Sequence, residues 1–144
     1  MAQTEQKNQN VKKQFEELQS LLERAMALQT SMVLFEWDDE TLAPKGAVEH
    51  TARVIGSLSE QYQEILASMR FKELLDVCLK AEKENAGVFD EVQSAILREA
   101  AEEQERLSCI PPEEYRAYAE LTARATGIWT RAREKMILLH LPLF

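Results

Sequence analysis

Apolar residues recur at intervals of three and four along most of the chain, with polar residues between them. This period is typical of amphipathic α-helices, and no alternating pattern indicates strands. The first series of periodic apolar residues predicts a helix over residues 10–37. The polar segment before it, at 1–9, is expected to be a flexible tail. The members of this series are Val11, Phe15, Leu18, Leu22, Ala25 and Met32, widened by Leu21, Leu28 and Phe35.

Turn residues separate this helix from two more. The Pro-Lys-Gly sequence at 44–46 predicts a break, because proline lacks a backbone donor and glycine tolerates a positive φ. The next apolar row predicts a helix over 47–68, and a shorter row predicts a third helix over 71–84. The Asn-Ala-Gly sequence at 85–87 is typical of a helix end.

Two further helices follow in the second half of the chain. Asp90 is the predicted N-cap of a helix that continues to about 106. Pro112 suits the first turn of a fifth helix, since it needs no hydrogen bond there and is followed by two acidic side chains. The apolar row of this helix continues to Met136.

These elements predict an all-α fold of about five helices, in which long antiparallel hairpins form a bundle. We expect the first two helices to pair, and the last two likewise. A chain of 144 residues can bury about two-thirds of its unfolded surface, which is enough for one core. We therefore expect a flexible tail at 1–9 and a single helical domain at 10–144.

Charge and cysteine content narrow the range of partners. Seventeen basic and twenty-five acidic residues give a net charge of -8, which repels nucleic acids and anionic membranes. Cys78 and Cys109 lack C-x-x-C spacing, and no signal peptide is recognised. We expect both thiols to be reduced in a cytoplasmic protein, with no nucleic-acid or membrane partner.

Four carboxylates, at Glu36, Asp38, Asp39 and Glu40, surround Trp37. Clustered oxygen ligands suit a divalent cation, but the spacing is not that of a calcium loop. The alternative is a capped turn in which an aspartate accepts backbone donors, Thr41 closes the bend and Trp37 packs inward. We favour the turn.

Other candidates also have simpler interpretations. His50 follows Glu49, but neighbours on a helix point in different directions, so we expect a solvated histidine. His140 has no nearby partner in sequence. The charged stretch at 99–106 could dock a partner but fits an ordinary helix exterior. An aromatic row could form a ligand box, although we favour a core role for it: Tyr115, Tyr118 and Trp129.

The segment W-D-D-E-T-L-A-P-K-G-A at 37–47, followed by Arg53, Ile55 and Leu58, resembles the N-terminal region of the carboxypeptidase Taq family of metallocarboxypeptidases. The likeness continues through F-K-E-L-L-D-V at 71–77, I-P-P-E-E-Y at 110–115, and Trp129 with Ala132-Arg133. These pieces occur in the family's order over residues 11–135.

The resemblance implies a cytoplasmic, metal-dependent exopeptidase that releases C-terminal residues from peptides, usually as a homodimer. In that family zinc is held by H-E-x-x-H and a downstream glutamate, and the N-terminal helices form a lid over the peptide cleft. This chain has no H-E-x-x-H, and its only histidines are His50 and His140. We therefore predict no catalytic, cofactor-binding or metal-binding residue in it, and no cofactor of its own.

Residues 136–144, M-I-L-L-H-L-P-L-F, depart from the family pattern. Restoring one adenine near Lys135, with synonymous codons freely chosen, gives Lys-Asn-Asp-Phe-Thr-Thr-Phe-Ala-Pro, which restores that pattern. Our hypothesis is that a one-base deletion shifted the frame of a longer gene. Sequencing the locus tests this, and the absence of a downstream frame encoding H-E-x-x-H would refute it.

We therefore expect a lid-like helical portion of a metallocarboxypeptidase, inactive alone. The alternative is a helical module for protein interaction or dimerisation without enzymatic activity. In either case, exposed apolar helix faces should favour a homo-oligomer, with residues 136–144 in the contact or stacked on the bundle.

Overall fold

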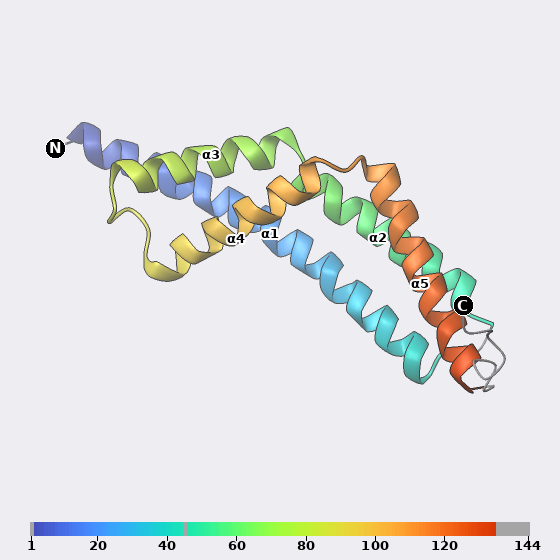
Figure 1. Ribbon diagram of the computed structural model, residues 1–144. Coiled ribbons are helices and arrows are strands. Elements are labelled where there is room, and N and C mark those ends of the chain that lie inside the picture. The colour runs from blue at the N-terminus through green and yellow to red at the C-terminus, as the bar shows by residue number, and fades with distance from the viewer. Residues whose placement is uncertain (1, 45, 135–144) are drawn as a thin grey trace, which may run out of the picture. The chain divides into compact units, whose positions relative to one another are not determined.

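The structure of the protein, a computed structural model, describes residues 2–44 and 46–134, which form five α-helices and no strand (Figure 1). The predicted all-α class is confirmed. The helices are α1 (Ala2–Thr41), α2 (Val48–Leu66), α3 (Met69–Glu84), α4 (Glu91–Ser108) and α5 (Pro112–Glu134).

The first helix begins earlier than the apolar period indicates. It starts at Ala2, whereas the sequence predicts a start near residue 10. Residues 2–10 contain neither proline nor glycine, and glutamine, glutamate and lysine are good helix formers. Lys7 also donates to Glu84 at 2.8 Å. Residues 2–10 are therefore helical because of their helix propensity and the ion pair to Glu84, although they carry no periodic apolar residues.

The chain divides into two compact units, and each is described by itself. Unit 1 comprises residues 1–27 and 62–111, and unit 2 comprises residues 28–61 and 112–144, in both cases as far as the structure describes them. The long helix α1 contributes its first part to unit 1 and its second part to unit 2. The single helical domain at 10–144 stays a prediction.

Unit 1 has a closed apolar core. Its α3 and α4 lie side by side (Figure 1). At this core Phe71 and Leu97 are fully buried, and the rings of Phe15 and Phe89 lie with their centroids 5.0 Å apart. Full burial of such a side chain contributes about 1.5–3 kcal/mol. The other fully buried apolar side chains here are Leu18, Leu74 and Cys78.

Polar contacts fix the helix ends of unit 1. Asp90 is the N-cap of α4, as predicted, and forms a capping box in which Gln93 N donates to Asp90 and Asp90 N donates to Gln93. Gln63, 1% exposed, donates from Nε2 to the carbonyls of Leu107 and Ile110. Leu107 lies in the last turn of α4, where helix carbonyls lack intrahelical partners, and Ile110 lies just after the helix end.

Unit 2 combines the second part of α1, most of α2, and α5. Its buried apolar residues are Val48, Ala52 and Ile55, all on α2. Ser59 on α2 donates to the Met32 sulfur of α1 at 3.0 Å. Within the described part of α5, only Gly127 is buried. This unit therefore has a thin core.

No helix in the described ranges is both long and apolar enough to cross a bilayer.

Candidate functional site

A groove of about 470 Å3 lies within unit 2, lined by α1, α2 and α5. Each helix contributes one row of residues at spacings of three and four, which places the members of a row on one face. The α2 row forms the floor, because it includes the three buried apolar residues of the unit. Its members are Val48, Thr51, Ala52, Ile55 and Ser59.

The α1 wall changes in character along its length. It starts with amide and apolar side chains and ends with three carboxylates at Glu36, Asp39 and Glu40. None of the three carboxylates has an ion pair with a described residue. The remaining members of this wall are Gln29, Met32 and Val33.

The α5 wall carries small and hydroxyl-bearing side chains. Ala119 and Ala123 are half-buried, so α5 presents little bulk at the centre of the row. Tyr118 is 67% exposed and stands at the rim. The other members are Tyr115, Thr122 and Thr126. The groove therefore has a floor of three apolar and two hydroxyl-bearing residues, an α1 wall that ends in carboxylates, and a neutral α5 wall.

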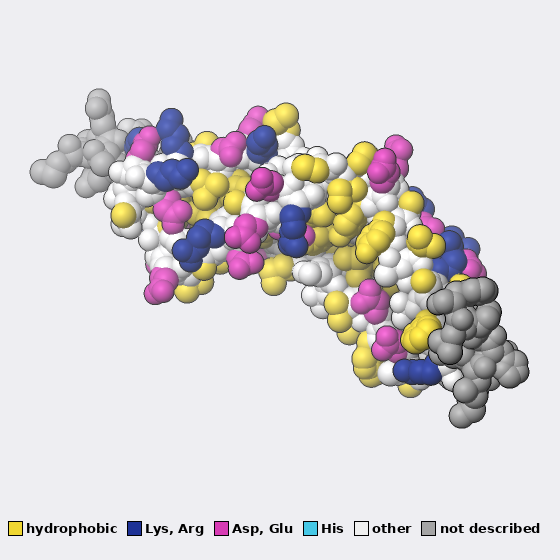
Figure 2. All heavy atoms as spheres, in the orientation of Figure 1, with side chains coloured by type: hydrophobic (Ala, Val, Ile, Leu, Met, Phe, Trp, Pro, Cys, Tyr) yellow, Lys and Arg dark blue, Asp and Glu magenta, His cyan; other side chains and the backbone are white. Residues whose placement is uncertain are grey.

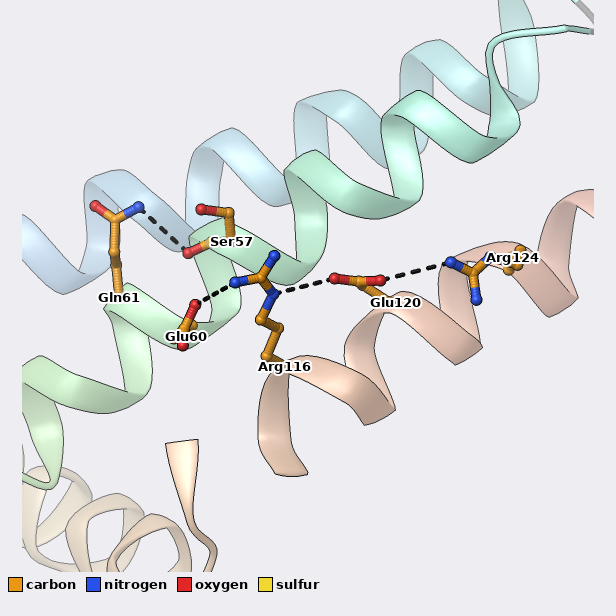
Figure 3. Close-up of polar contacts among 6 residues, drawn as sticks. All are labelled: Ser57, Glu60, Gln61, Arg116, Glu120 and Arg124. Atoms are coloured by element: carbon orange, nitrogen blue, oxygen red, sulfur yellow. Dashed lines mark hydrogen bonds and ion pairs between the residues drawn. The ribbon is translucent and has the colours of Figure 1, made fainter. Parts of the chain in front are cut away.

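A chain of ion pairs joins α5 to α2 (Figure 3). Arg116 contacts Glu60 of α2 at 2.9 Å and Glu120 of its own helix at 3.1 Å. Arg124 reaches Glu49 of α2 at 3.0 Å and the other Glu120 oxygen at 3.5 Å. The hydrogen bonds to Glu120 and Glu60 raise the pKa of Arg116 above its ordinary value. We call this chain, Glu60–Arg116–Glu120–Arg124–Glu49, the ion-pair ladder.

Two glycines allow α2 and α5 to approach closely. A Cβ placed on Gly56 would lie 2.3 Å from Glu120 Cγ, and one on Gly127 would lie 2.7 Å from Val48 Cγ1. Neither distance is tolerable, so a side chain at these positions would displace its neighbour. The ladder and these close approaches orient α5 against α2, and the apolar layer between the two helices is thin.

The predicted acidic cluster is only partly brought together. Glu36, Asp39 and Glu40 line the groove, whereas Asp38 does not. The bend is closed by backbone groups, because Leu42 N and Ala43 N donate to the Asp38 carbonyl rather than to a carboxylate. The Thr41 hydroxyl donates to the Trp37 carbonyl at 2.6 Å.

Of the four aromatic residues that we expected to pack inward, three are exposed instead. Trp37 does not pack inward but is 57% exposed, and Trp129 is 55% exposed. Tyr118 is also exposed, while Tyr115 is half-buried. The row assigned to the core thus divides: both tyrosines line the groove, and Trp129 does not. On the face shown in Figure 2, hydrophobic side chains reach the surface over α2 and α5.

The remaining candidates lie outside the groove. His50 is exposed, as predicted, and His140 lies outside the described residues. The charged stretch at 99–106 is half exposed, with Ala100 buried. Tyr62 donates to Glu103 at 3.1 Å, and Arg106 pairs with Glu103. Cys78 and Cys109 are free thiols.

The described residues do not fit a zinc site. No group of three or more His, Cys, Asp or Glu among residues 2–44 and 46–134 could hold a metal ion. The acidic wall offers only carboxylates, whereas zinc sites of peptidases use imidazole nitrogen with oxygen ligands. The prediction that this chain has no catalytic, cofactor or metal ligand stays a prediction.

The groove itself was not predicted from the apolar pattern of the chain. Its signal was present on α1, where residues 29, 32, 33, 36 and 40 keep a helical spacing that continues from apolar into acidic positions. A second signal was the pairing of Ala119 with Ala123 on the face of α5 that carries Tyr115 and Tyr118. Small residues in such a row indicate space beside the helix rather than a packed core.

The comparisons identify a class of protein. Residues 17–138 match the family model of carboxypeptidase Taq (M32) metallopeptidase. The chain is 34% identical to Carboxypeptidase 1 of Bacillus subtilis (strain 168) over 115 residues. This alignment covers 80% of the chain and 22% of that protein.

A solved structure agrees with the sequence match. The BsuCP crystal structure matches with a TM-score of 0.78 and 32% identity, over 85% of this chain and 24% of that chain. The chain therefore belongs to the carboxypeptidase Taq (M32) metallopeptidase family, as its motifs indicate. It spans about a quarter or less of the relatives that it matches.

Proposed function

We propose that the chain is the N-terminal, lid-like helical portion of a metal-dependent carboxypeptidase that releases C-terminal residues from peptides in the cytoplasm. On this proposal the metal and the catalytic groups belong to the part of the enzyme beyond these 144 residues. The chain alone is inactive.

The family match over residues 17–138 carries this proposal. The alignment with Carboxypeptidase 1 from Bacillus subtilis covers 80% of this chain but only 22% of that protein, so most of that relative has no counterpart here. The 144 residues contain no H-E-x-x-H sequence. Because the two histidines stand at 50 and 140, one helical turn cannot present both to a metal.

The surface of unit 2 supports a covering role. Large apolar side chains are exposed there, including Leu121 at 62% and Ile128 at 55%. Contiguous exposed apolar surface is typical of interaction sites. An enzyme body packed on this surface would remove these side chains from water.

The test measures release of C-terminal residues from a peptide, with added zinc or cobalt. One sample is the chain alone, and the other is the chain mixed with a Carboxypeptidase 1 that lacks the segment matching this chain, which we call the body. We expect release from the mixture above that of the body alone, and none from the chain alone. Ile128→Glu should reduce the gain, whereas Val92→Glu, at an exposed position of unit 1, should not. Release by the chain alone would contradict the proposal.

A helical interaction module without enzymatic activity is the second candidate. The groove in unit 2 favours it, because a binding surface needs no metal. A chain that binds a different protein and restores nothing to a carboxypeptidase body would support this alternative.

Self-association is part of both proposals. Exposed apolar side chains on unit 2 would be covered by a second copy if no other partner were present. Sedimentation velocity over a dilution series measures it. We expect a concentration-dependent dimer, and a monomer at every concentration would contradict this expectation.

A further inference from the structure

The three rows that line the groove are equal in length. They span residues 29–40 on α1, 48–59 on α2 and 115–126 on α5. At a rise of 1.5 Å per residue, eleven steps give about 16 Å, or three helical turns. The length of this groove, bounded by three helices, matches about three turns of one further helix. Amphipathic helices bind proteins in such grooves through their apolar face.

The charges around the groove are not balanced by the described residues. Glu36, Asp39 and Glu40 on α1 form no ion pair with a described residue, whereas Arg116 and Arg124 on α5 already pair with other carboxylates. In the ladder, Arg116 and Arg124 contact Glu60 and Glu120 on the α2 side of α5 (Figure 3). Arg124 also contacts Glu49 of α2. The α1 wall therefore retains its negative charge beside an apolar floor.

We propose that this groove binds a basic amphipathic α-helix of another polypeptide. Its apolar face would lie on Val48, Ala52 and Ile55 of the floor, and lysine or arginine side chains at one edge would pair with the α1 carboxylates. Opposite charges across an interface steer association and set the orientation of the partner. The proposal is independent of the carboxypeptidase role.

Other occupants fit the groove less well. Nucleic acids and anionic membranes carry the same sign of charge as its α1 wall. A second copy of the chain has a net charge of -8, so its approach to an acidic wall is unfavourable. A basic helix satisfies the floor and the wall together.

The probe is a synthetic Leu/Lys amphipathic helix of about four turns, labelled for fluorescence anisotropy. Its counterpart with every lysine replaced by glutamate is the control peptide. We expect the lysine peptide to bind and to weaken as salt increases, since salt screens partly exposed charges. Failure of the lysine peptide to bind at low salt would overturn the proposal.

Two alanines on α5 test the position of the site. Ala123 lines the groove, and Ala125 is exposed on the same helix outside it. Ala123→Phe should weaken peptide binding by at least about tenfold, equivalent to 1.4 kcal/mol, while Ala125→Phe should leave it unchanged. Equal binding by the two variants would place the peptide elsewhere. Circular dichroism checks that each variant folds, and Ala119→Phe is a second blocking variant.

A matched pair of triple variants tests the charge. Glu36→Gln, Asp39→Asn and Glu40→Gln remove the groove carboxylates. Glu99→Gln, Glu102→Gln and Glu105→Gln remove the same net charge from exposed positions of α4. The first triple should weaken binding by at least about tenfold and lower its salt dependence. An equal effect of both triples would indicate general attraction to an acidic protein and overturn the proposal.

Sedimentation distinguishes a second copy from a foreign helix. If the chain dimerises and Ala123→Phe, but not Ala125→Phe, abolishes the dimer, the groove is an interface between copies and the proposed occupant is wrong. A monomer or dimer unaffected by Ala123→Phe agrees with a foreign helix as the occupant.

Discussion

Unit 1 and unit 2 are built from the same kind of helix but bury very different amounts of apolar surface. Of the buried apolar residues in the described ranges, fifteen belong to unit 1 and three to unit 2. Of the exposed large apolar residues, five belong to unit 1 and nine to unit 2. Unit 1 therefore has an apolar core covered by its own helices. Unit 2 leaves apolar side chains exposed, as a surface that packs against another part of an assembly would.

The forces that hold the two units differ accordingly. Unit 1 relies on apolar burial and on capping contacts at Asp90 and Gln63. Unit 2 relies on ion pairs and close glycine approaches between α2 and α5. Ion pairs near the surface contribute little stability but define geometry. A surface with defined geometry and exposed apolar groups suits binding.

The largest expected effect is the loss of a core side chain in unit 1. Phe71→Ala should lower the free energy of unfolding by about 3–5 kcal/mol, because it leaves a cavity among fully buried neighbours. Leu121→Ala, at a position 62% exposed in unit 2, should change it by less than about 0.5 kcal/mol. Urea unfolding measures both, and similar losses would remove the contrast between the units.

The glycine approach in unit 2 should give a smaller loss. Gly127→Ala places a Cβ against Val48, where overpacking costs about 1–3 kcal/mol. Alanine has the better helix propensity, which offsets about 1 kcal/mol of this cost, so we expect a net loss of about 1 kcal/mol in urea unfolding. With Val48→Ala in the background, Gly127→Ala should no longer destabilise the protein. A loss of the same size in both backgrounds would show that the two residues do not press on each other.

The ion-pair ladder should contribute less again. Glu120→Gln removes the carboxylate that Arg116 and Arg124 share, and we expect a loss of about 0.2–1 kcal/mol that shrinks as salt is added. Glu114→Gln, on an exposed part of the same helix, is the matched control. A salt-independent loss at Glu120 would indicate packing rather than charge.

The buried thiol of Cys78 reports whether the core of unit 1 is closed to solvent. Its ionisation has little effect on the free energy of unfolding at neutral pH. Burial raises the pKa of the Cys78 thiol to about 11 from its ordinary 9.0. Below pH 9.0 the thiol is protonated in both folded and unfolded chains, and above it the unfolded chain ionises first. The contribution of this thiol to stability is therefore present below 9.0 and is lost as pH rises through about 11.

Alkylation at pH 8 is the direct measurement, with exposed Cys109 as the internal reference. Cys109 should react rapidly, and Cys78 should react only when the chain is unfolded in urea. Comparable rates in the folded protein would mean that the core of unit 1 opens readily.

Local signals in the sequence account for much of the fold. Turn residues and caps are short-range features, so Asp90 and Pro112 mark the starts of α4 and α5 correctly. The start of α1 could not be found from apolar period, since the segment before residue 10 is helical through propensity and through an ion pair to Glu84. That contact depends on tertiary structure.

The groove was harder to predict for a physical reason. Tyr115, Tyr118 and Trp129 follow the same period whether their face is covered or open. Periodicity assigns residues to one face of a helix but does not state what lies opposite that face. Only the structure shows that the α5 row borders open space, and that its arginines are turned toward α2.

The most direct test of the open groove is amide hydrogen exchange, followed by mass spectrometry, with and without the Leu/Lys helix. Our account predicts that α3 and α4 exchange slowly in both samples, because their apolar core is closed. It predicts that residues 29–40 and 115–126, the groove walls of α1 and α5, exchange faster in the free chain and slow down when the helix is added. Equal protection of α5 and α3 in the free chain, with no change on addition of the helix, would contradict it.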